Sequence, residues 1–136
     1  MKVLIIVARV LLGFVFVVFG LNAFLHFIPM SPPEGLAGEF MQALFASHYF
    51  YVVALLQIAG GALCLISGRL VPPGLMLLGP VIVNILLFHI FLQSKGLGMA
   101  VGVSVVSLFL LWAYRQAFAG LFRPVATTPA APAPAV

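Results

Sequence analysis

Four long apolar stretches dominate the pattern of hydrophobic and polar positions along the chain. They cover residues 3–28, 49–67, 73–92 and 97–118. Each has close to the roughly 20 residues that a helix needs to cross the hydrocarbon core of a bilayer. Open strands would leave backbone groups unpaired in lipid, and no alternating barrel pattern is present. The pattern therefore predicts an all-α fold, with four transmembrane helices bundled in one membrane domain of residues 1–123.

Apolar residues recur at a regular spacing between the first two stretches. Leu36, Phe40 and Leu44 recur every four residues, which predicts a short helix lying in the membrane interface. The alternative is an irregular loop, which Gly35 and Gly38 favour because glycine weakens a helix.

Two prolines predict where one helix begins and where another is kinked. Ser31 and Glu34 have capping-box spacing, so the short helix is expected to begin with Pro32 at its first position. Pro80 lies in the middle of the third stretch and removes the amide that would bond to the carbonyl of Met76. A kink is therefore expected at Pro80.

Composition agrees with a chain solvated by lipid. Hydrophobic residues make up 65% of the chain and charged residues 6%, whereas soluble domains carry about 25% charged residues. Little length remains for a separate catalytic domain, and residues 124–136 predict a disordered Pro/Ala tail.

The single cysteine, Cys64, excludes an internal disulfide or a CxxC pair. The basic residues are scattered along the chain, so no nucleic-acid partner is expected.

The basic residues also predict an orientation. If both termini lie on one side, that side receives most of the positive charge, and the other side receives Lys95 with Glu34 and Glu39. The positive-inside rule then places both termini in the cytoplasm, in a bacterial inner membrane. The residues on the terminal side are Lys2, Arg69, Arg115 and Arg123, with Arg9 nearest to it.

Several residues within the stretches suggest structural roles. Arg9 lies about 9 Å inside the first stretch and either snorkels toward the headgroups or acts inside the bundle. Gly13 and Gly20 fall near its face, where small residues would let another helix approach. Gly61 belongs to a similar stripe in the second stretch. Gly98 and Gly102 form a GxxxG motif that indicates either homodimerisation or tight bundle packing.

Polar residues gather in the outward half of the predicted bundle. Amides and imidazoles at this depth form a candidate ligand-binding pocket, because polar groups inside a membrane are costly unless they serve a purpose. The alternative is that the amides join helices by hydrogen bonds while the histidines contact headgroups. A metal site or axial haem ligation is less favoured, since no local ligand spacing supports either. The candidate ligand-binding residues are Asn22, His26, Gln57, Asn84 and His89, with His48 nearby.

Three segments resemble the DoxX/DoxD-like family of small four-helix bacterial membrane proteins. The first combines residues 8–13 with 19–21, and the others are residues 57–69 and 79–89. Many members carry a lysine near Asn22 and a glutamate where this chain has Gln57. The loss of both charges together is electrostatically sensible.

The resemblance implies more about fold than about activity. DoxD-like members are associated with a thiosulfate:quinone oxidoreductase, and DoxX proteins with redox partners. We therefore expect an accessory or quinone-binding subunit of a membrane redox system rather than a stand-alone enzyme. A quinone is the candidate ligand, while a redox-protein partner, a larger complex and homo-oligomerisation all remain open. The alternative is a scaffold acting only through helix–helix contacts, and a transporter is less favoured.

Overall fold

The computed structural model describes residues 1–122, which form only helices and their connections. The predicted tail, residues 124–136, lies outside the described residues. The expected short helix is present as α2, and the fourth apolar stretch divides into α5 and α6. The helices are α1 (Lys2–Leu25), α2 (Gly35–Ala46), α3 (Tyr49–Ile66), α4 (Val71–Phe91), α5 (Leu97–Ala113) and α6 (Arg115–Ala119), with 3₁₀ turns η1 (Gly68–Leu70) and η2 (Gly120–Phe122).

Four of these helices form a ring in which α1 packs on α3, α3 on α4, α4 on α5, and α5 back on α1. Three helical segments are long and apolar enough to cross a membrane, and they contain α1, α3 and α4. α5 is also apolar but has only 17 residues. The chain is thus an all-α protein with the properties of a membrane protein.

Glycines set the close contacts of the central helix α3. A β-carbon added at Gly61 would lie 2.7 Å from the carbonyl oxygen of Gly13 on α1. A β-carbon at Gly74 on α4 would lie 2.8 Å from the carbonyl oxygen of Gly60. Gly60 and Gly61 are neighbours on a helix and so point about 100° apart. One pair of glycines therefore lets α3 approach two different helices.

The hydrophobic core occupies the end of the bundle where α1 begins. The largest fully buried side chains are Leu12, Leu78, Leu110, Val71 and Cys64, and all five lie in that half of their helices. Closer to the opposite end, which carries α2, the buried side chains of α1 and α3 are small or polar, among them Ala23, Ala54 and Asn22. The end where α1 begins is therefore the packed end of the bundle.

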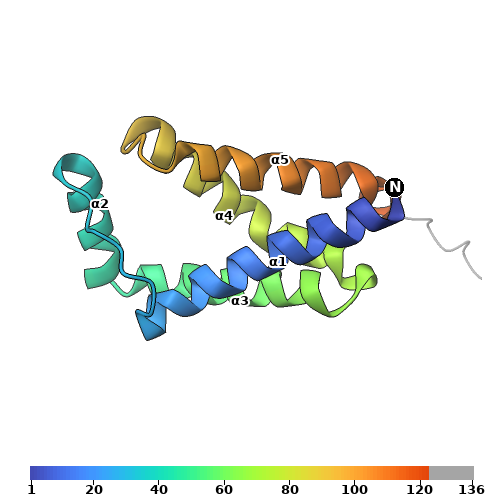
Figure 1. Cartoon of the computed structure of the whole chain (residues 1–136), viewed down its shortest axis with the longest axis horizontal. Coiled ribbons are helices and arrows are strands. Elements are labelled where there is room, and N and C mark those ends of the chain that lie inside the picture. The colour runs from blue at the N-terminus through green and yellow to red at the C-terminus, as the bar shows by residue number, and fades with distance from the viewer. Residues whose placement is uncertain (123–136) are drawn as a thin grey trace, which may run out of the picture.

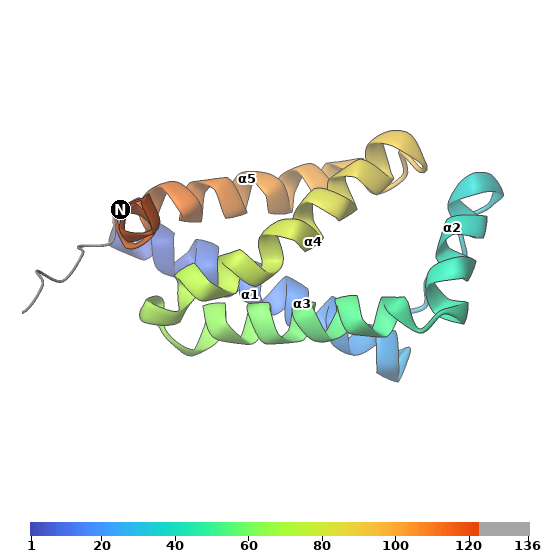
Figure 2. The same cartoon turned by 180° about the vertical axis from the view of Figure 1, so that it is seen from behind.

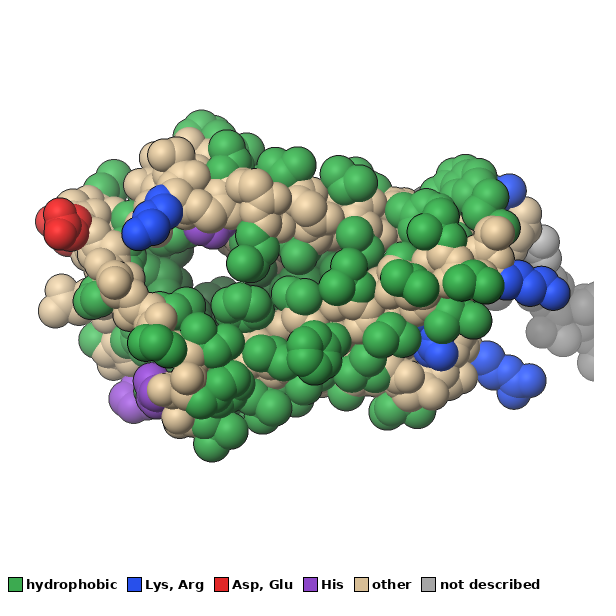
Figure 3. Space-filling model, viewed as in Figure 1, with side chains coloured by type: hydrophobic (Ala, Val, Ile, Leu, Met, Phe, Trp, Pro, Cys, Tyr) green, Lys and Arg blue, Asp and Glu red, His purple; other side chains and the backbone are tan. Residues whose placement is uncertain are grey.

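The two helix pairs diverge toward the α2 end. Figures 1 and 2 show α1 and α3 running together while the α4–α5 hairpin leans away from them, with α2 standing across the mouth between the pairs. α4 stays continuous through Pro80 but changes direction near its middle, where the proline removes one backbone hydrogen bond. The space-filling view shows a window through the molecule at this mouth (Figure 3).

The structure corrects three details of the sequence predictions. α2 begins at Gly35 with Glu34 as its N-cap and no side-chain cap, so no capping box starts the helix at Pro32. α5 ends at Ala113, and the chain turns at Tyr114, where Tyr114 and Phe118 pack onto the core. Gly98 and Gly102 take no part in bundle packing, because a β-carbon at either would meet no atom within 4 Å.

Candidate functional site

Arg9 joins two helices at the packed end. Its guanidinium Nη1 donates a hydrogen bond of 3.0 Å to the carbonyl oxygen of Cys64. Cys64 lies in the last turn of α3, where carbonyls lack partners within the helix and the helix dipole favours a positive charge. Arg9 therefore faces protein and caps α3.

Asn22 forms hydrogen bonds to the backbone just after the end of α1. Its Oδ1 accepts a hydrogen bond of 2.6 Å from the amide of Ile28, and its Nδ2 donates one of 3.3 Å to the carbonyl of Ile28. Its own carbonyl accepts from the amide of His26, which ends α1 in a left-handed conformation with φ 51°. Asn22 is 3% exposed, whereas His26 is exposed. These two residues shape the turn, and His26 lies outside the interior of the ring.

Gln57 lies on the side of α3 that faces α1 and α4. It lies four residues before Gly61, which faces α1, and three before Gly60, which faces α4. Its side chain therefore points between the two helices. Because Gly60 lies against Leu78, one turn toward α2 brings Gln57 level with residues just past Pro80. This is the depth at which α4 changes direction.

The amide of Gln57 has no partner among residues 1–122. The side chain is only 9% exposed, and no hydrogen bond joins its amide to any described residue. No side-chain nitrogen or oxygen in the described structure is both fully enclosed and unpaired. Both amide atoms of Gln57 therefore keep some accessible surface although the residue is buried. An unpaired amide in an apolar environment costs roughly 2–7 kcal/mol, so this position favours a hydrogen-bonding occupant.

Asn84 and His89 lie on α4, further toward the mouth. Asn84 is exposed, and its Nδ2 donates to the carbonyl of Pro80 at 2.9 Å. It shares a helix face with Phe88, whose ring lies 6.0 Å from that of Phe40 on α2. This face of α4 therefore turns toward α2, while Asn84 itself remains exposed.

His89 supports the turn between α4 and α5. Its Nδ1 lies 3.0 Å from the carbonyl oxygen of Gln93, so Nδ1 carries the proton and Nε2 is left as an acceptor. The ring also lies against Gly96, whose φ of 96° suits glycine, and a β-carbon there would lie 2.8 Å from the ring. His89 is therefore a turn residue as well as a candidate ligand-binding residue.

The three histidines are not brought together. Among residues 1–122, no group of three or more His, Cys, Asp or Glu side chains has a geometry that could hold a metal ion. His26 ends α1, His48 precedes α3, and His89 lies near the end of α4. Nothing in this arrangement supports a three-histidine centre.

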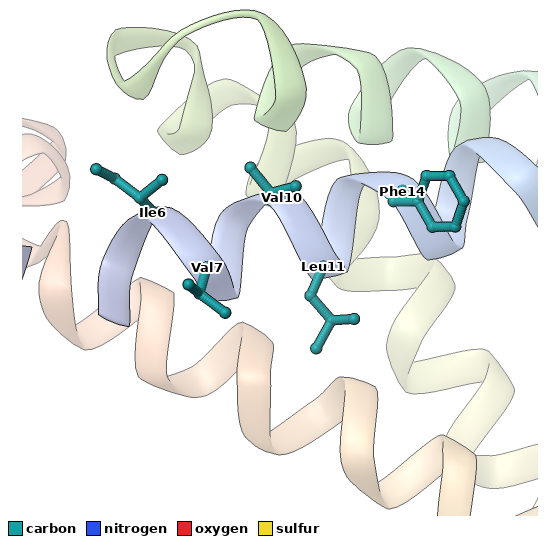
Figure 4. A pocket seen from close by; sticks show the side chains of 5 residues that line it. All are labelled: Ile6, Val7, Val10, Leu11 and Phe14. Carbon is teal, nitrogen blue, oxygen red and sulfur yellow. The ribbon is translucent and has the colours of Figure 1, made fainter. Parts of the chain in front are cut away.

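Two shallow apolar grooves mark the outside of the bundle. The first has a volume of about 410 Å³ and lies on α1 alone (Figure 4), and the second, of about 220 Å³, lies between α1 and α5. The first contains no side chain that can form a hydrogen bond. Its lining residues are Ile6, Val7, Val10, Leu11 and Phe14. The sequence carries no signal for either groove, because every lining residue resembles an ordinary lipid-facing one.

Charge is distributed unequally between the two ends. Glu34 and Glu39 lie at the α2 end with Lys95, while Lys2 and Arg69 lie at the packed end (Figure 3). Arg115 also lies there, donating to the carbonyl of Trp112 at 3.0 Å with its guanidinium 4.9 Å from the centre of that ring. An aromatic and basic belt of this kind is typical of a membrane interface.

Compared with known proteins, the chain matches no family model, no curated protein and no solved structure. Its resemblance to the DoxX/DoxD-like family therefore rests on the three sequence segments alone.

Proposed function

We propose that this protein is a four-span, DoxX-like inner-membrane protein that binds a quinone-like lipid as an accessory subunit of a membrane redox system. In this proposal α5 spans the membrane together with the three longer helices. Both termini lie in the cytoplasm, so the mouth and α2 lie at the periplasmic surface. The concentration of Lys and Arg at the packed end supports this orientation.

The observation that carries the proposal is the unpaired amide of Gln57. A primary amide has two donor hydrogens and an accepting oxygen. It can therefore donate to the carbonyl of a quinone or accept from the hydroxyl of the corresponding quinol. Asn84, further toward the mouth on α4, has spare hydrogen-bonding capacity beyond its bond to Pro80. Asn22 and His89 hold the turns on either side of the mouth and so help keep its shape.

The test is stabilisation of the purified protein by a soluble quinone. We expect 2,3-dimethoxy-5-methyl-1,4-benzoquinone to raise the Tm of the wild-type protein in mild detergent. The Gln57→Leu variant should lose this response, because leucine has similar size but no hydrogen-bonding group. Gln116→Leu is the matched control, since Gln116 is exposed on α6, at the opposite end of the bundle.

Two outcomes would overturn the proposal. One is a wild-type Tm that does not respond to the quinone. The other is a Gln57→Leu variant that responds as strongly as the wild type does.

A second candidate is a scaffold that acts through helix–helix contacts. The groove on α1 favours it, because Val10 and Phe14, which line it (Figure 4), are 43% and 60% exposed. A partner helix in this groove would be recovered with the protein in mild detergent. Val10→Trp, which fills the groove, should release that partner. Recovery of the same partner with Val10→Trp would count against the scaffold.

A further inference from the structure

We infer that Arg9 is the centre of a binding site for an anionic phospholipid, whose phosphate lies at the packed end of the bundle, beside the turn that follows α3. The inference does not depend on quinone binding, because Gln57 lies about 10 Å further along α3 toward the opposite end. Three observations support it: the unused donors of Arg9, the depth of its guanidinium, and the absence of an acidic side chain from this half of the described chain.

The guanidinium of Arg9 has more hydrogen-bond donors than the protein uses. An arginine side chain has five N–H groups, and among residues 1–122 one of them is paired, in the 3.0 Å bond from Nη1 to the carbonyl oxygen of Cys64. The side chain is half-buried, and none of its nitrogens is both enclosed and unpaired. The other nitrogens therefore keep accessible surface. A phosphate suits them, because a planar guanidinium can donate two parallel hydrogen bonds to its oxygens.

The depth of the guanidinium matches the headgroup region of a bilayer. Cys64 lies two residues before the end of α3 at Ile66, so its carbonyl is about 3 Å from the end of the helix. The chain then turns through Ser67 and η1 before α4 begins. The Arg9 side chain thus extends from within α1 to the level of this turn, as arginine does when it snorkels toward the membrane surface. Lipid phosphates of the adjacent leaflet lie at the same level.

No acidic side chain is available to neutralise Arg9. The chain has two acidic side chains, Glu34 and Glu39, and both lie at the α2 end (Figure 3). A partly buried cation in a membrane is costly without a partner. The ligand chemistry that meets this need is a phosphate ester, and the bilayer supplies it at this depth as a phospholipid headgroup.

Other polar groups near Arg9 favour the same ligand. The bond between Arg9 and Cys64 places the start of α1 beside the end of α3. Lys2 lies on the same face of α1 as Arg9, because seven residues make nearly two turns. In the turn after α3, the Ser67 hydroxyl accepts from the amide of Arg69 at 3.2 Å, and its own hydrogen has no acceptor among residues 1–122. Two more cations and one hydroxyl donor thus lie at this end of the α1–α3 pair.

The experiment compares three molecules that share parts of one phospholipid. Dioleoylphosphatidylglycerol has the phosphate and the chains, dioleoylglycerol has the chains alone, and glycerol 3-phosphate has the phosphate alone. With the full chain in an uncharged detergent, we expect native mass spectrometry to show binding of the phospholipid that is about tenfold tighter than that of either part.

Two results of this comparison would overturn the inference. If dioleoylglycerol bound as tightly as the phospholipid, the phosphate would not be the group that is recognised. If glycerol 3-phosphate bound as tightly, the site would serve a soluble phosphate ester instead of a lipid.

Arg9→Gln removes the charge but keeps a side-chain donor. We expect this variant to bind dioleoylphosphatidylglycerol about tenfold more weakly than the wild type. Arg115→Gln is the matched control, because it removes an arginine from the same end whose guanidinium is already engaged by the carbonyl and the ring of Trp112. Its affinity should stay within about twofold of the wild type. Equal weakening by the two variants would show that only the total charge of this end attracts the lipid, and would overturn the inference.

Lys2→Gln keeps the test decisive if Arg9→Gln does not fold. Lys2 is exposed in the first turn of α1, so its replacement leaves the packing of the bundle intact. We expect Lys2→Gln to bind the phospholipid about fivefold more weakly than Arg115→Gln does, since a basic residue near the surface contributes on this scale to lipid binding. Equal affinities of Lys2→Gln and Arg115→Gln would overturn the inference.

Discussion

Gly13 on α1 and Gly61 on α3 pack backbone against backbone. A β-carbon at either residue would lie 2.7 Å from the carbonyl oxygen of the other, which is too close for any other residue to fit without movement. Small residues allow this approach between helices in lipid, where dispersion contacts rather than the hydrophobic effect hold helices together. The α1–α3 pair is therefore the fixed side of the opening, from which the α4–α5 hairpin diverges.

Replacing Gly61 by alanine should separate α1 from α3. The added methyl group meets the Gly13 carbonyl oxygen and also Val17, at 3.0 Å. We expect a loss of about 1–3 kcal/mol, the usual cost of overpacking, measured as a lower Tm in detergent. Gly79→Ala is the control, because a β-carbon at Gly79 meets nothing within 4 Å, and it should leave stability unchanged or raise it. Equal stability of the two variants would show that the close contact has no energetic weight.

Removing the cation at Arg9 should expose the end of α3. Arg9→Met loses the hydrogen bond to the Cys64 carbonyl, and a hydrogen bond to a charged group contributes about 1.5–3 kcal/mol. Arg9→Lys keeps a donor and should lose less. Thermal unfolding followed by the fluorescence of the single tryptophan, Trp112, would measure the difference. An Arg9→Met variant as stable as the wild type would show that Arg9 only contacts headgroups.

Asn22 should slow hydrogen exchange in the segment that follows α1. Asn22→Leu removes both hydrogen bonds to Ile28, so we expect faster hydrogen exchange in residues 26–34, observed by mass spectrometry. Asn84→Leu is the control, because the Asn84 amide bonds only within its own helix, and it should leave exchange in that segment unchanged. Slow exchange in Asn22→Leu would mean that other contacts, such as those of α2, hold the segment.

The sequence predicted the helices well, because backbone groups inside a bilayer must be hydrogen-bonded and an α-helix pairs them within one segment. The spans containing α1, α3 and α4 begin and end within a few residues of the apolar stretches. The break between α5 and α6 at Tyr114 was not predicted, because this turn depends on packing of Phe118 against distant residues. Local hydropathy does not report such packing.

The candidate site was harder to predict, because hydropathy gives depth but not the direction of a side chain. Gln57 and Asn22 are both buried amides, yet Asn22 is fully engaged by Ile28 while Gln57 has no partner among residues 1–122. The difference follows from the turn after α1, whose left-handed residue His26 is not visible as a turn signal in the sequence. The direction of Gln57 follows from the glycines Gly60 and Gly61, which orient α3 against two helices.

Pro80 should control the width of the opening. Pro80→Ala restores the backbone amide that can bond to the carbonyl of Met76, so we expect α4 to straighten and its outer half to move toward α3. Spin labels at Val52→Cys and Leu87→Cys, both exposed positions on α3 and α4, would report the change in a background with Cys64→Ala. Their distance should shorten in Pro80→Ala, and the stabilisation by quinone should fall with it. A shorter distance with undiminished quinone binding would separate the kink from the site, whereas an unchanged distance would show that the packing of α4 on α5, rather than the proline, holds the mouth open.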